Sequence, residues 1–162
     1  MKILELNVKN KKSVIDEAVA VFKNGGLVVY PTETCYGAGV MATNENAVKK
    51  LLKYKKRPSG KAISIAVANI EMAKSYVIIN KTAESVYEKF LPGPVTVVSE
   101  SKNNVADGIA SEFNTLGVRI PDFEFMLDVI EKLSSPMTAT SANSAGKKTP
   151  YNVADILDNL SE

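Results

Sequence analysis

Apolar residues recur at helical spacing in several segments of the chain. Val14, Ala18, Val21 and Phe22 have helical spacing, and Ser13 followed by Asp16 resembles a helix-starting capping pair. The residues Asn-Gly-Gly at 24–26 end this segment. The same criteria predict further helices over residues 44–56, 70–77, 82–90, 122–133 and 153–160, with Asp122 as the cap of the fourth of these.

Short apolar runs rich in β-branched residues separate the predicted helices. Strands are predicted over residues 27–30, 63–67, 95–99, 117–120 and 137–141. Pro31 and Pro121 end two of these strands, because proline removes a hydrogen-bond donor from the ladder. Strands and helices alternate without the rhythm of a doubly wound sheet. The expected class is therefore mixed α/β, in a single domain that spans residues 1–162.

One lysine interrupts the pattern of the helix predicted over residues 44–56. Val48, Leu51, Leu52 and Lys55 share an apolar face at 3.6 residues per turn, whereas Lys49, Lys53 and Lys56 lie on another face. A lysine on a core-facing stripe either extends to the rim of the core or meets an anion, because an unpaired buried ammonium is costly. We therefore expect Lys55 to point inward, with both explanations open.

The composition excludes several kinds of chemistry. The 162 residues include no histidine and one cysteine, Cys35, which excludes histidine-dependent nucleophiles, the usual zinc sites and intrachain disulfides. The sequence shows neither a signal peptide nor a membrane span, and we expect a soluble, cytoplasmic protein with no membrane partner. The net charge of +2 is too small to indicate nucleic acid binding by itself.

Only two of the 20 basic residues are arginines, Arg57 and Arg119. The planar guanidinium binds carboxylates and phosphates in a bidentate fashion, so both are candidates for an anion site, and structural surface arginines are an equal alternative. Arg57 lies near Lys55 and Lys61, beside Pro58. Such a cluster can hold a triphosphate without a Walker loop, whereas a solvated basic helix end is the plainer interpretation.

Two short polar segments follow predicted strands. Thr32 and Thr34 alternate on an extended turn, so their hydroxyls can face the same side and suit an amino acid ligand. Ser141 and Asn143 offer a hydroxyl and an amide to phosphate or ribose. For the threonines the alternative is that they bond only to the local backbone, and the second segment can equally be a turn.

Five short motifs follow one another along the chain. They are Tyr30-Pro31-Thr32-Glu33-Thr34-x-Tyr36-Gly37, Lys55-x-Arg57-Pro58 with Lys61, Pro92-Gly93-Pro94-x-Thr96, Gly117-Val118-Arg119-Ile120-Pro121 and Thr138-Ala139-Thr140-Ser141-Ala142-Asn143. Together they closely resemble the YrdC/TsaC family of threonylcarbamoyl-AMP synthases, over nearly the whole chain. Three positions, Ala62, Ala66 and Lys147, depart from the family's pattern, and at the last of these the family commonly has arginine.

The resemblance implies a YrdC-like α/β fold, with a twisted sheet that is mostly parallel and partly antiparallel, and with helices around a large open basic cavity. It implies threonine binding by Thr32, Thr34 and Arg119. It also implies catalytic roles for Lys55 and Arg57, and ATP binding by Lys55, Arg57, Lys61, Ser141, Asn143 and Lys147.

The activity that the resemblance implies is that of a nucleotidyltransferase. ATP, L-threonine and bicarbonate would give L-threonylcarbamoyladenylate and pyrophosphate, for threonylcarbamoyladenosine modification of tRNA. Magnesium is expected with the ATP substrate, and no tightly bound protein metal is expected. A threonylcarbamoyl transferase complex is the expected recipient of the intermediate.

Two other functions are compatible with these residues. The first is a tRNA-binding or double-stranded RNA-binding module without synthase activity, in which a lysine face of Lys49, Lys50, Lys53 and Lys56 contacts phosphates. The second is a carbamoyl-transfer relative of the hydrogenase-maturation type, which uses the same fold within a much longer chain. Threonine-dependent release of pyrophosphate distinguishes the synthase from the RNA-binding module.

Overall fold

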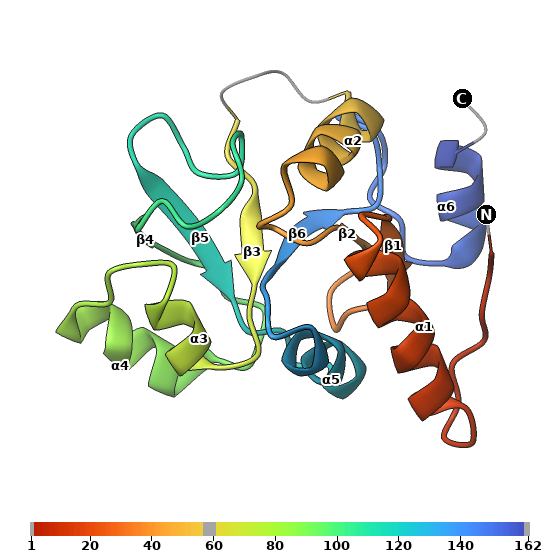
Figure 1. The fold of residues 1–162 in the computed structure, drawn as a ribbon, viewed down its shortest axis with the longest axis horizontal. Coiled ribbons are helices and arrows are strands. Elements are labelled where there is room, and N and C mark those ends of the chain that lie inside the picture. Colours follow the sequence, from red (N-terminus) through yellow and green to blue (C-terminus); the bar gives the residue numbers. More distant parts are fainter. Residues whose placement is uncertain (1, 57–60, 161–162) are drawn as a thin grey trace.

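The computed structural model describes residues 2–56 and 61–160. Within them, strands form one sheet in the order β1-β2-β6-β3-β5-β4 (Figure 1). The strands are β1 (Val28–Tyr30), β2 (Gly37–Gly39), β3 (Ser64–Ala66), β4 (Val97–Glu100), β5 (Thr115–Arg119) and β6 (Met137–Ser141). All except β2 overlap strands that the sequence predicted, and the mixed α/β class is confirmed.

Helices surround this sheet, and each of them overlaps a predicted helix. They are α1 (Lys11–Lys23), α2 (Glu45–Lys55), α3 (Ile70–Lys74), α4 (Lys81–Phe90), α5 (Glu124–Leu133) and α6 (Val153–Leu160). Two predicted caps were wrong. Asn10 precedes α1, where Ser13 lies inside the helix and donates to Asn10 O at 2.9 Å, and Phe123 rather than Asp122 precedes α5. No helix within residues 2–56 and 61–160 is both long and apolar enough to cross a membrane.

The strand pairing is mostly antiparallel. β3 and β5 are parallel, with Ile65 opposite Val118, whereas β1–β2, β2–β6, β3–β6 and β4–β5 are antiparallel. The expectation of a mostly parallel sheet was therefore wrong. A parallel pair needs a long crossover between its strands, and the connection from β3 to β5 provides one through α3, α4 and β4.

Helix α2 carries the interrupted apolar face that the sequence predicted. The side chain of Asn44 caps its first turn by accepting from the backbone N–H of Ala47 at 3.0 Å. The buried face of the helix consists of Ala47, Val48, Leu51 and Lys55. Lys55 is only 3% exposed, so the prediction that it points inward is confirmed.

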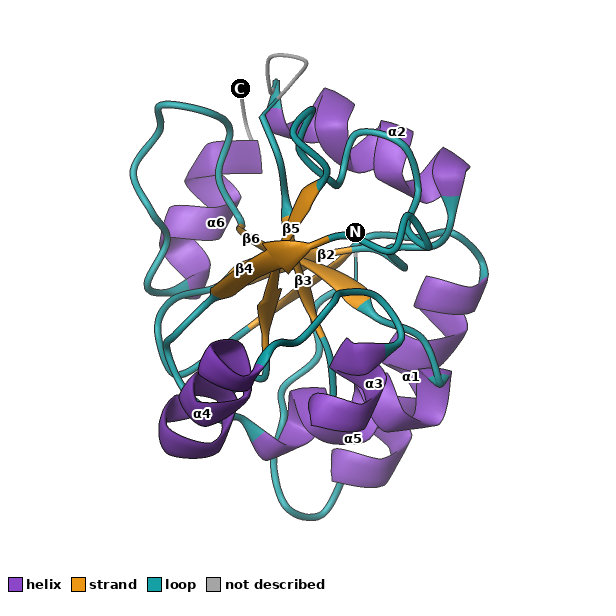
Figure 2. Ribbon diagram, turned by 90° about the vertical axis from the view of Figure 1, so that its left-hand side faces the viewer, coloured by secondary structure: helices purple, strands orange, loops and turns teal. Residues whose placement is uncertain are grey.

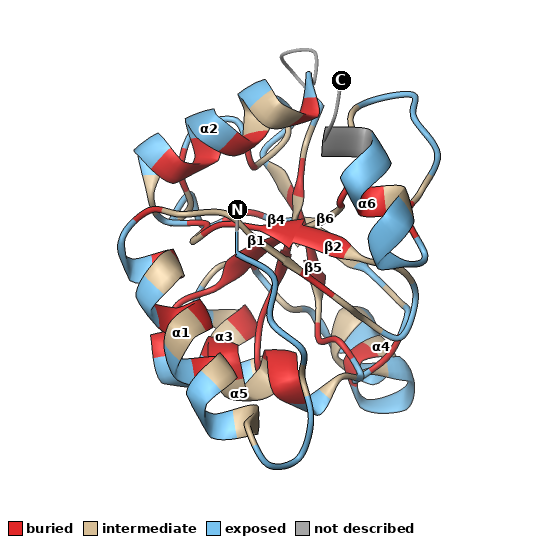
Figure 3. Ribbon diagram, turned by 90° about the vertical axis from the view of Figure 1, so that its right-hand side faces the viewer, coloured by how far each residue is buried: buried red, intermediate tan, exposed pale blue. Residues whose placement is uncertain are grey.

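The sheet lies between two apolar cores. On one face, Ile65 and Val118 pack in a core that includes Val48 and Leu51 of α2, while the other core contains the paired helices α1 and α5. Figure 2 shows α2 on one side of the sheet and α1 and α5 on the other. Figure 3 shows that these helices turn buried residues inward and exposed residues outward. This arrangement gives each amphipathic helix a partner surface.

Helices α1 and α5 cover only part of their face of the sheet. Ala66 of β3 packs at the edge of the core that they form and also lines a cavity, and Ser64 lines the same cavity beyond that core. Side chains two residues apart in a strand point to the same face of the sheet, so Ser64 and Ala66 lie on the same side. The uncovered part of this face is therefore where a ligand can approach the strands.

The strand that the sequence did not predict, β2, consists of Gly37, Ala38 and Gly39, all of them buried. Glycine and alanine have low strand propensity, which explains the omission. The structure requires small residues here, because a Cβ atom on Gly39 would lie 2.8 Å from Met137 Cε and 2.9 Å from Tyr30 Cε1. β2 is thus defined by its neighbours in the sheet rather than by its own residues.

Gly39→Ala is expected to lower the free energy of unfolding by about 1–3 kcal/mol, the usual effect of overpacking a core. Tyr30 cannot move away without loss, because its buried hydroxyl donates to Thr138 O at 3.2 Å. Urea unfolding followed by circular dichroism measures the change. A variant as stable as the wild type would show that β2 has room that the structure does not display.

Candidate active site

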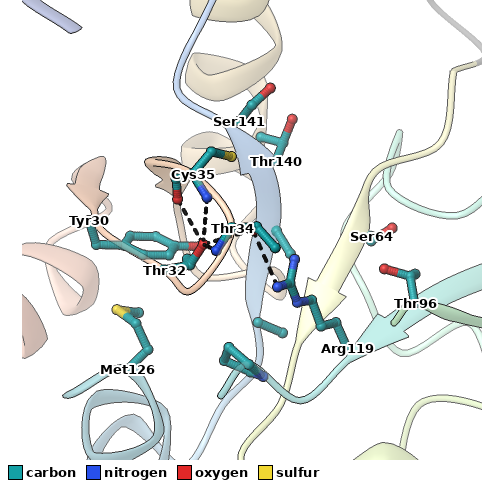
Figure 4. A pocket seen from close by; sticks show the side chains of 14 residues that line it. Tyr30, Thr32, Thr34, Cys35, Ser64, Thr96, Arg119, Met126, Thr140 and Ser141 are labelled. Carbon is teal, nitrogen blue, oxygen red and sulfur yellow. Dashed lines mark hydrogen bonds between the residues drawn. The ribbon is translucent and has the colours of Figure 1, made fainter. Parts of the chain in front are cut away.

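A cavity of about 120 Å³ opens on the uncovered face of the sheet. Its walls come from the loop after β1, from β3, β5 and β6, and from Met126 of α5 (Figure 4). Four of the predicted site residues line it, namely Thr32, Thr34, Arg119 and Ser141. Pockets for drug-sized ligands usually measure about 300–1,000 Å³, so this cavity suits a small ligand such as an amino acid.

Arg119 donates three hydrogen bonds at the wall of the cavity. Its Nε–H donates to Gly93 O at 3.2 Å, and its Nη2 donates to Glu33 Oε1 at 2.6 Å and to Thr34 Oγ1 at 3.3 Å. Figure 4 shows the side chain reaching from β5 toward Thr34. The guanidinium side chain is 17% exposed. The Pro92-Gly93-Pro94 turn thus has a role that the sequence did not reveal, as a carbonyl support for Arg119.

Glu33 is the acidic partner of this arginine, and sequence reasoning gave it no role. Its Oε1 also accepts from the backbone N–H of Asp122 at 3.0 Å. Burial alone would raise the pKa of this carboxyl, but hydrogen bonds from Arg119 and from backbone N–H groups outweigh burial, and the pKa lies below its ordinary value. The ion pair therefore contributes stability above the ordinary glutamate pKa, and this contribution is lost as the pH falls through the lowered value.

The two threonines of the loop after β1 have different roles. Thr32 Oγ1 donates to Cys35 O at 2.7 Å and accepts from the backbone N–H groups of Thr34 and Cys35 at 3.1 and 3.2 Å. Thr34 Oγ1 lies 2.9 Å from Thr32 Oγ1 and accepts from Arg119. The local-backbone alternative thus describes Thr32, whereas Thr34 connects the turn to the arginine.

Lys55 forms a second cluster, which begins at Ser141. Its Nζ donates to Ser141 O at 2.5 Å and to Asn143 Oδ1 at 3.4 Å. Since the side chain of Ser141 lines the cavity, this residue belongs to the cavity through its side chain and to the lysine cluster through its carbonyl. A buried ammonium stabilised by oxygen acceptors avoids the cost of an unpaired charge.

The segment after β6 is docked on the end of α2 by several hydrogen bonds. The buried Asn143 donates through Nδ2 to Lys147 O at 2.6 Å, and Tyr54 OH donates to Ala142 O at 3.2 Å. The backbone N–H of Ala145 donates to Lys55 O at 2.8 Å. The side chain of Lys147 is exposed. These contacts place Ser141, Asn143 and Lys147 near the inward-facing Lys55.

Two of the predicted phosphate ligands lie at an interruption of the described chain. Arg57 falls within residues 57–60, outside the described residues, so its prediction is not tested by the structure. Lys61 is the residue at which the described chain resumes, and it is exposed. Both positions follow the C-terminal end of α2, which is also the end that carries Lys55.

The remaining polar groups of the cavity are hydroxyls. Ser64, Thr96 and Thr140 line it, and their hydroxyls form no hydrogen bond within residues 2–56 and 61–160. Over the same residues, no group of three or more histidine, cysteine, aspartate and glutamate side chains is arranged to hold a metal ion. The cavity therefore offers one guanidinium and several neutral hydroxyls to a ligand.

Comparison with protein families provides an independent result. Residues 20–162 match the model of the Sua5/YciO/YrdC family, whose description reads "Telomere recombination". The chain belongs to this family. The resemblance seen in the five sequence motifs is thereby confirmed.

Relatives of the Sua5/YciO/YrdC family cover most of the chain. A Klebsiella pneumoniae protein named threonylcarbamoyl-AMP synthase is 30% identical over 154 residues, which are 93% of this chain and 81% of the relative. A Methanocaldococcus jannaschii protein, provisionally given the same name, is 37% identical over 157 residues, 96% of this chain and 73% of the relative.

A solved structure of the family extends the comparison to three dimensions. The crystal structure of Pyrococcus abyssi Sua5 complexed with L-threonine matches with a TM-score of 0.87 and 33% identity. The match covers 98% of this chain and 45% of the P. abyssi chain. This family member therefore spans less than half the length of that Sua5 protein.

Proposed function

We propose that the protein is a threonylcarbamoyl-AMP synthase, a nucleotidyltransferase that uses L-threonine, bicarbonate and ATP. The observation that carries this proposal is the guanidinium of Arg119, oriented beside Thr34 in a small cavity. The names of the relatives and the L-threonine complex of P. abyssi Sua5 support it. A cytoplasmic location is part of this proposal, because the proposed reaction and its use need ATP and tRNA together.

The threonine substrate is proposed to bind at Arg119. A carboxylate accepts charge-assisted hydrogen bonds from a guanidinium, and these are stronger than neutral ones. Thr34 would orient the same ligand, whereas Thr32 shapes the turn, since its hydroxyl is engaged by Cys35 and by backbone N–H groups. The hydroxyls of Ser64 and Thr96 lie on the neighbouring wall of the cavity and are further contacts for a polar amino acid.

The ATP phosphates are proposed to bind on the other side of Ser141. The Lys55 ammonium supplies fixed positive charge next to Ser141. It also holds Ser141 in place by donating to the Ser141 carbonyl oxygen. Asn143 is anchored by the same ammonium and by Lys147 O. By resemblance, Arg57, Lys61 and Lys147 complete the site, and magnesium enters with the ATP as part of the substrate.

The reaction has two steps. The threonine amine attacks bicarbonate and forms an N-carboxy group, with loss of water. An oxygen of this carbamate then attacks the α-phosphate of ATP, and the bond to the β-phosphate bridging oxygen breaks to release pyrophosphate. Both partners of the second step are anions, so the enzyme must align them while fixed cations reduce their repulsion.

The product is a reactive acyl adenylate that a second protein must use. We propose a threonylcarbamoyl transferase complex as the recipient and the adenosine of a tRNA as the final acceptor. The RNA-binding alternative without synthase activity is not favoured, because the relatives are named as synthases. Binding of tRNA with a steep dependence on salt, without threonine-dependent chemistry, is the result that would revive it.

Purified protein is expected to release pyrophosphate from ATP, magnesium and bicarbonate only when L-threonine is present. A coupled pyrophosphate assay with threonine omitted, and with bicarbonate omitted, measures this dependence. Arg57→Ala is expected to abolish the signal, because the resemblance assigns Arg57 to the phosphates. ATP hydrolysis that is indifferent to threonine would contradict the proposed function.

A further inference from the structure

Glu33 joins two walls of the cavity through a single oxygen atom. Its Oε1 accepts from Arg119 Nη2 at 2.6 Å and from the backbone N–H of Asp122 at 3.0 Å. Glu33 lies in the loop after β1. Arg119 is the last residue of β5, and Asp122 lies in the short connection from β5 to α5. The Glu33 side chain is 20% exposed. This carboxylate therefore fixes the position of the loop relative to the arginine.

The hydrogen bonds of Arg119 account for three of its five N–H donors. Nε–H is directed at Gly93 O, and the two Nη2 hydrogens are directed at Glu33 and Thr34. Nη1 forms no hydrogen bond within the described residues. The guanidinium is thus held along one edge, and its Nη1 group remains for a ligand.

We propose that Glu33 is the positioning residue of this site, which fixes the Arg119 guanidinium so that its Nη1 group binds the substrate carboxylate. The inference rests on the proposed function for the identity of the ligand. Holding the guanidinium in advance lowers the ordering cost of binding, because a rotamer-rich side chain no longer has to be immobilised by the ligand.

An opposite role for Glu33 would be competition, in which its negative charge occupies Arg119 until a substrate displaces it. The geometry disfavours displacement. Removal of the carboxylate would also leave the backbone N–H of Asp122 without its acceptor, so a ligand would have to replace two hydrogen bonds. The two roles predict opposite effects of Glu33→Ala on threonine binding.

The kinetics of pyrophosphate release distinguish the positioning role of Glu33 from the competing role. Glu33→Ala is expected to raise the KM for threonine about tenfold, the effect of one hydrogen bond to a charged group. The KM for ATP should change by less than about twofold, because the Glu33 carboxylate bonds to Arg119 and to the backbone of Asp122 rather than to Lys55, Ser141 or Asn143. Glu33→Gln should restore most of the threonine affinity, since its amide oxygen accepts both hydrogen bonds. Glu71→Ala, which removes a solvent-exposed ion pair to Lys74 on α3, is the control for loss of a glutamate charge and should behave as wild type.

A second readout does not depend on activity. Because the chain has only two arginines, its guanidinium Nε–H groups give two ¹⁵N–¹H NMR signals, and Arg119→Lys identifies the signal of Arg119. In wild type we expect slow rotation about the Arg119 Nε–Cζ bond and separate Nη signals. Glu33→Ala should average these signals, and Glu33→Gln should largely preserve them.

The two readouts separate the possible outcomes. A lower threonine KM in Glu33→Ala would overturn positioning in favour of competition, and unchanged Arg119 signals would overturn it as well. Wild-type protein without threonine-dependent pyrophosphate release would refute the proposed function, while the NMR result would still decide whether Glu33 holds Arg119. If Glu33→Ala does not fold, Glu33→Gln and Glu33→Asp provide the same comparison.

Discussion

Arg119→Ala is expected to lower kcat/KM for threonine by about a hundredfold, because hydrogen bonds to charged groups contribute roughly 1.5–3 kcal/mol and each 1.4 kcal/mol is tenfold. Arg119 is the cationic side chain among the described residues that line the cavity. Its removal leaves several hydroxyls, which cannot neutralise a carboxylate. Steady-state pyrophosphate release at varied threonine measures the loss.

Two companion variants test the cause of this loss. Arg119→Lys keeps the charge, but an ammonium lacks the planar fork that donates to Gly93 O, Glu33 and Thr34 at once. This variant should therefore have intermediate activity. Lys132→Ala removes a surface ion pair to Asp16 and is the control for a change of charge. Thermal unfolding must show that Arg119→Ala is folded. An unchanged KM for threonine would mean that the carboxylate binds elsewhere.

Lys55→Met is expected to destabilise the protein by about 2 kcal/mol, since buried acceptors of a charged donor lose their partner. Ser141 O and Asn143 Oδ1 are among the acceptors that would lose this donor. The same change removes the fixed charge beneath the proposed phosphate site, and kcat/KM for ATP should fall about a hundredfold. Urea unfolding measures the first effect, and pyrophosphate release at varied ATP measures the second.

Lys53→Met is the matched control for this experiment. Lys53 lies on the same helix and is exposed, so the identical substitution removes a charge without a buried contact. It should leave stability within about 0.5 kcal/mol of wild type, as surface substitutions usually do. Loss of stability without loss of ATP affinity in Lys55→Met would limit Lys55 to a role in packing.

The helices were predictable because each depends on a local pattern. In α2, a period of 3.6 residues was enough to place Val48, Leu51 and Lys55 on one buried face. Strand β2 was not predictable in this way, because Gly37 and Gly39 are selected by the approach of Tyr30 and Met137 across the sheet. The mostly antiparallel pairing is also a property of strand order, which no local pattern contains.

The candidate site, like the fold, was predictable from local sequence patterns only in part. The motifs brought Thr32, Thr34, Arg119 and Ser141 to one cavity, as the resemblance implies. They did not reveal the pair of Glu33 and Arg119, because these residues are 86 positions apart in the chain. A carboxylate between two threonines, in a chain with only two arginines, was the available signal. Which of two distant charges meet depends on the sheet order.

The walls of the cavity come from segments that are far apart in the sequence, so the cavity exists only while the sheet is intact. Ligand affinity and unfolding are consequently linked quantities. A ligand that binds only the folded chain adds about 2.7 kcal/mol to its stability at a hundred times the dissociation constant. Threonine at high concentration would thus protect the entire sheet, including strands that it never touches, from heat and proteolysis.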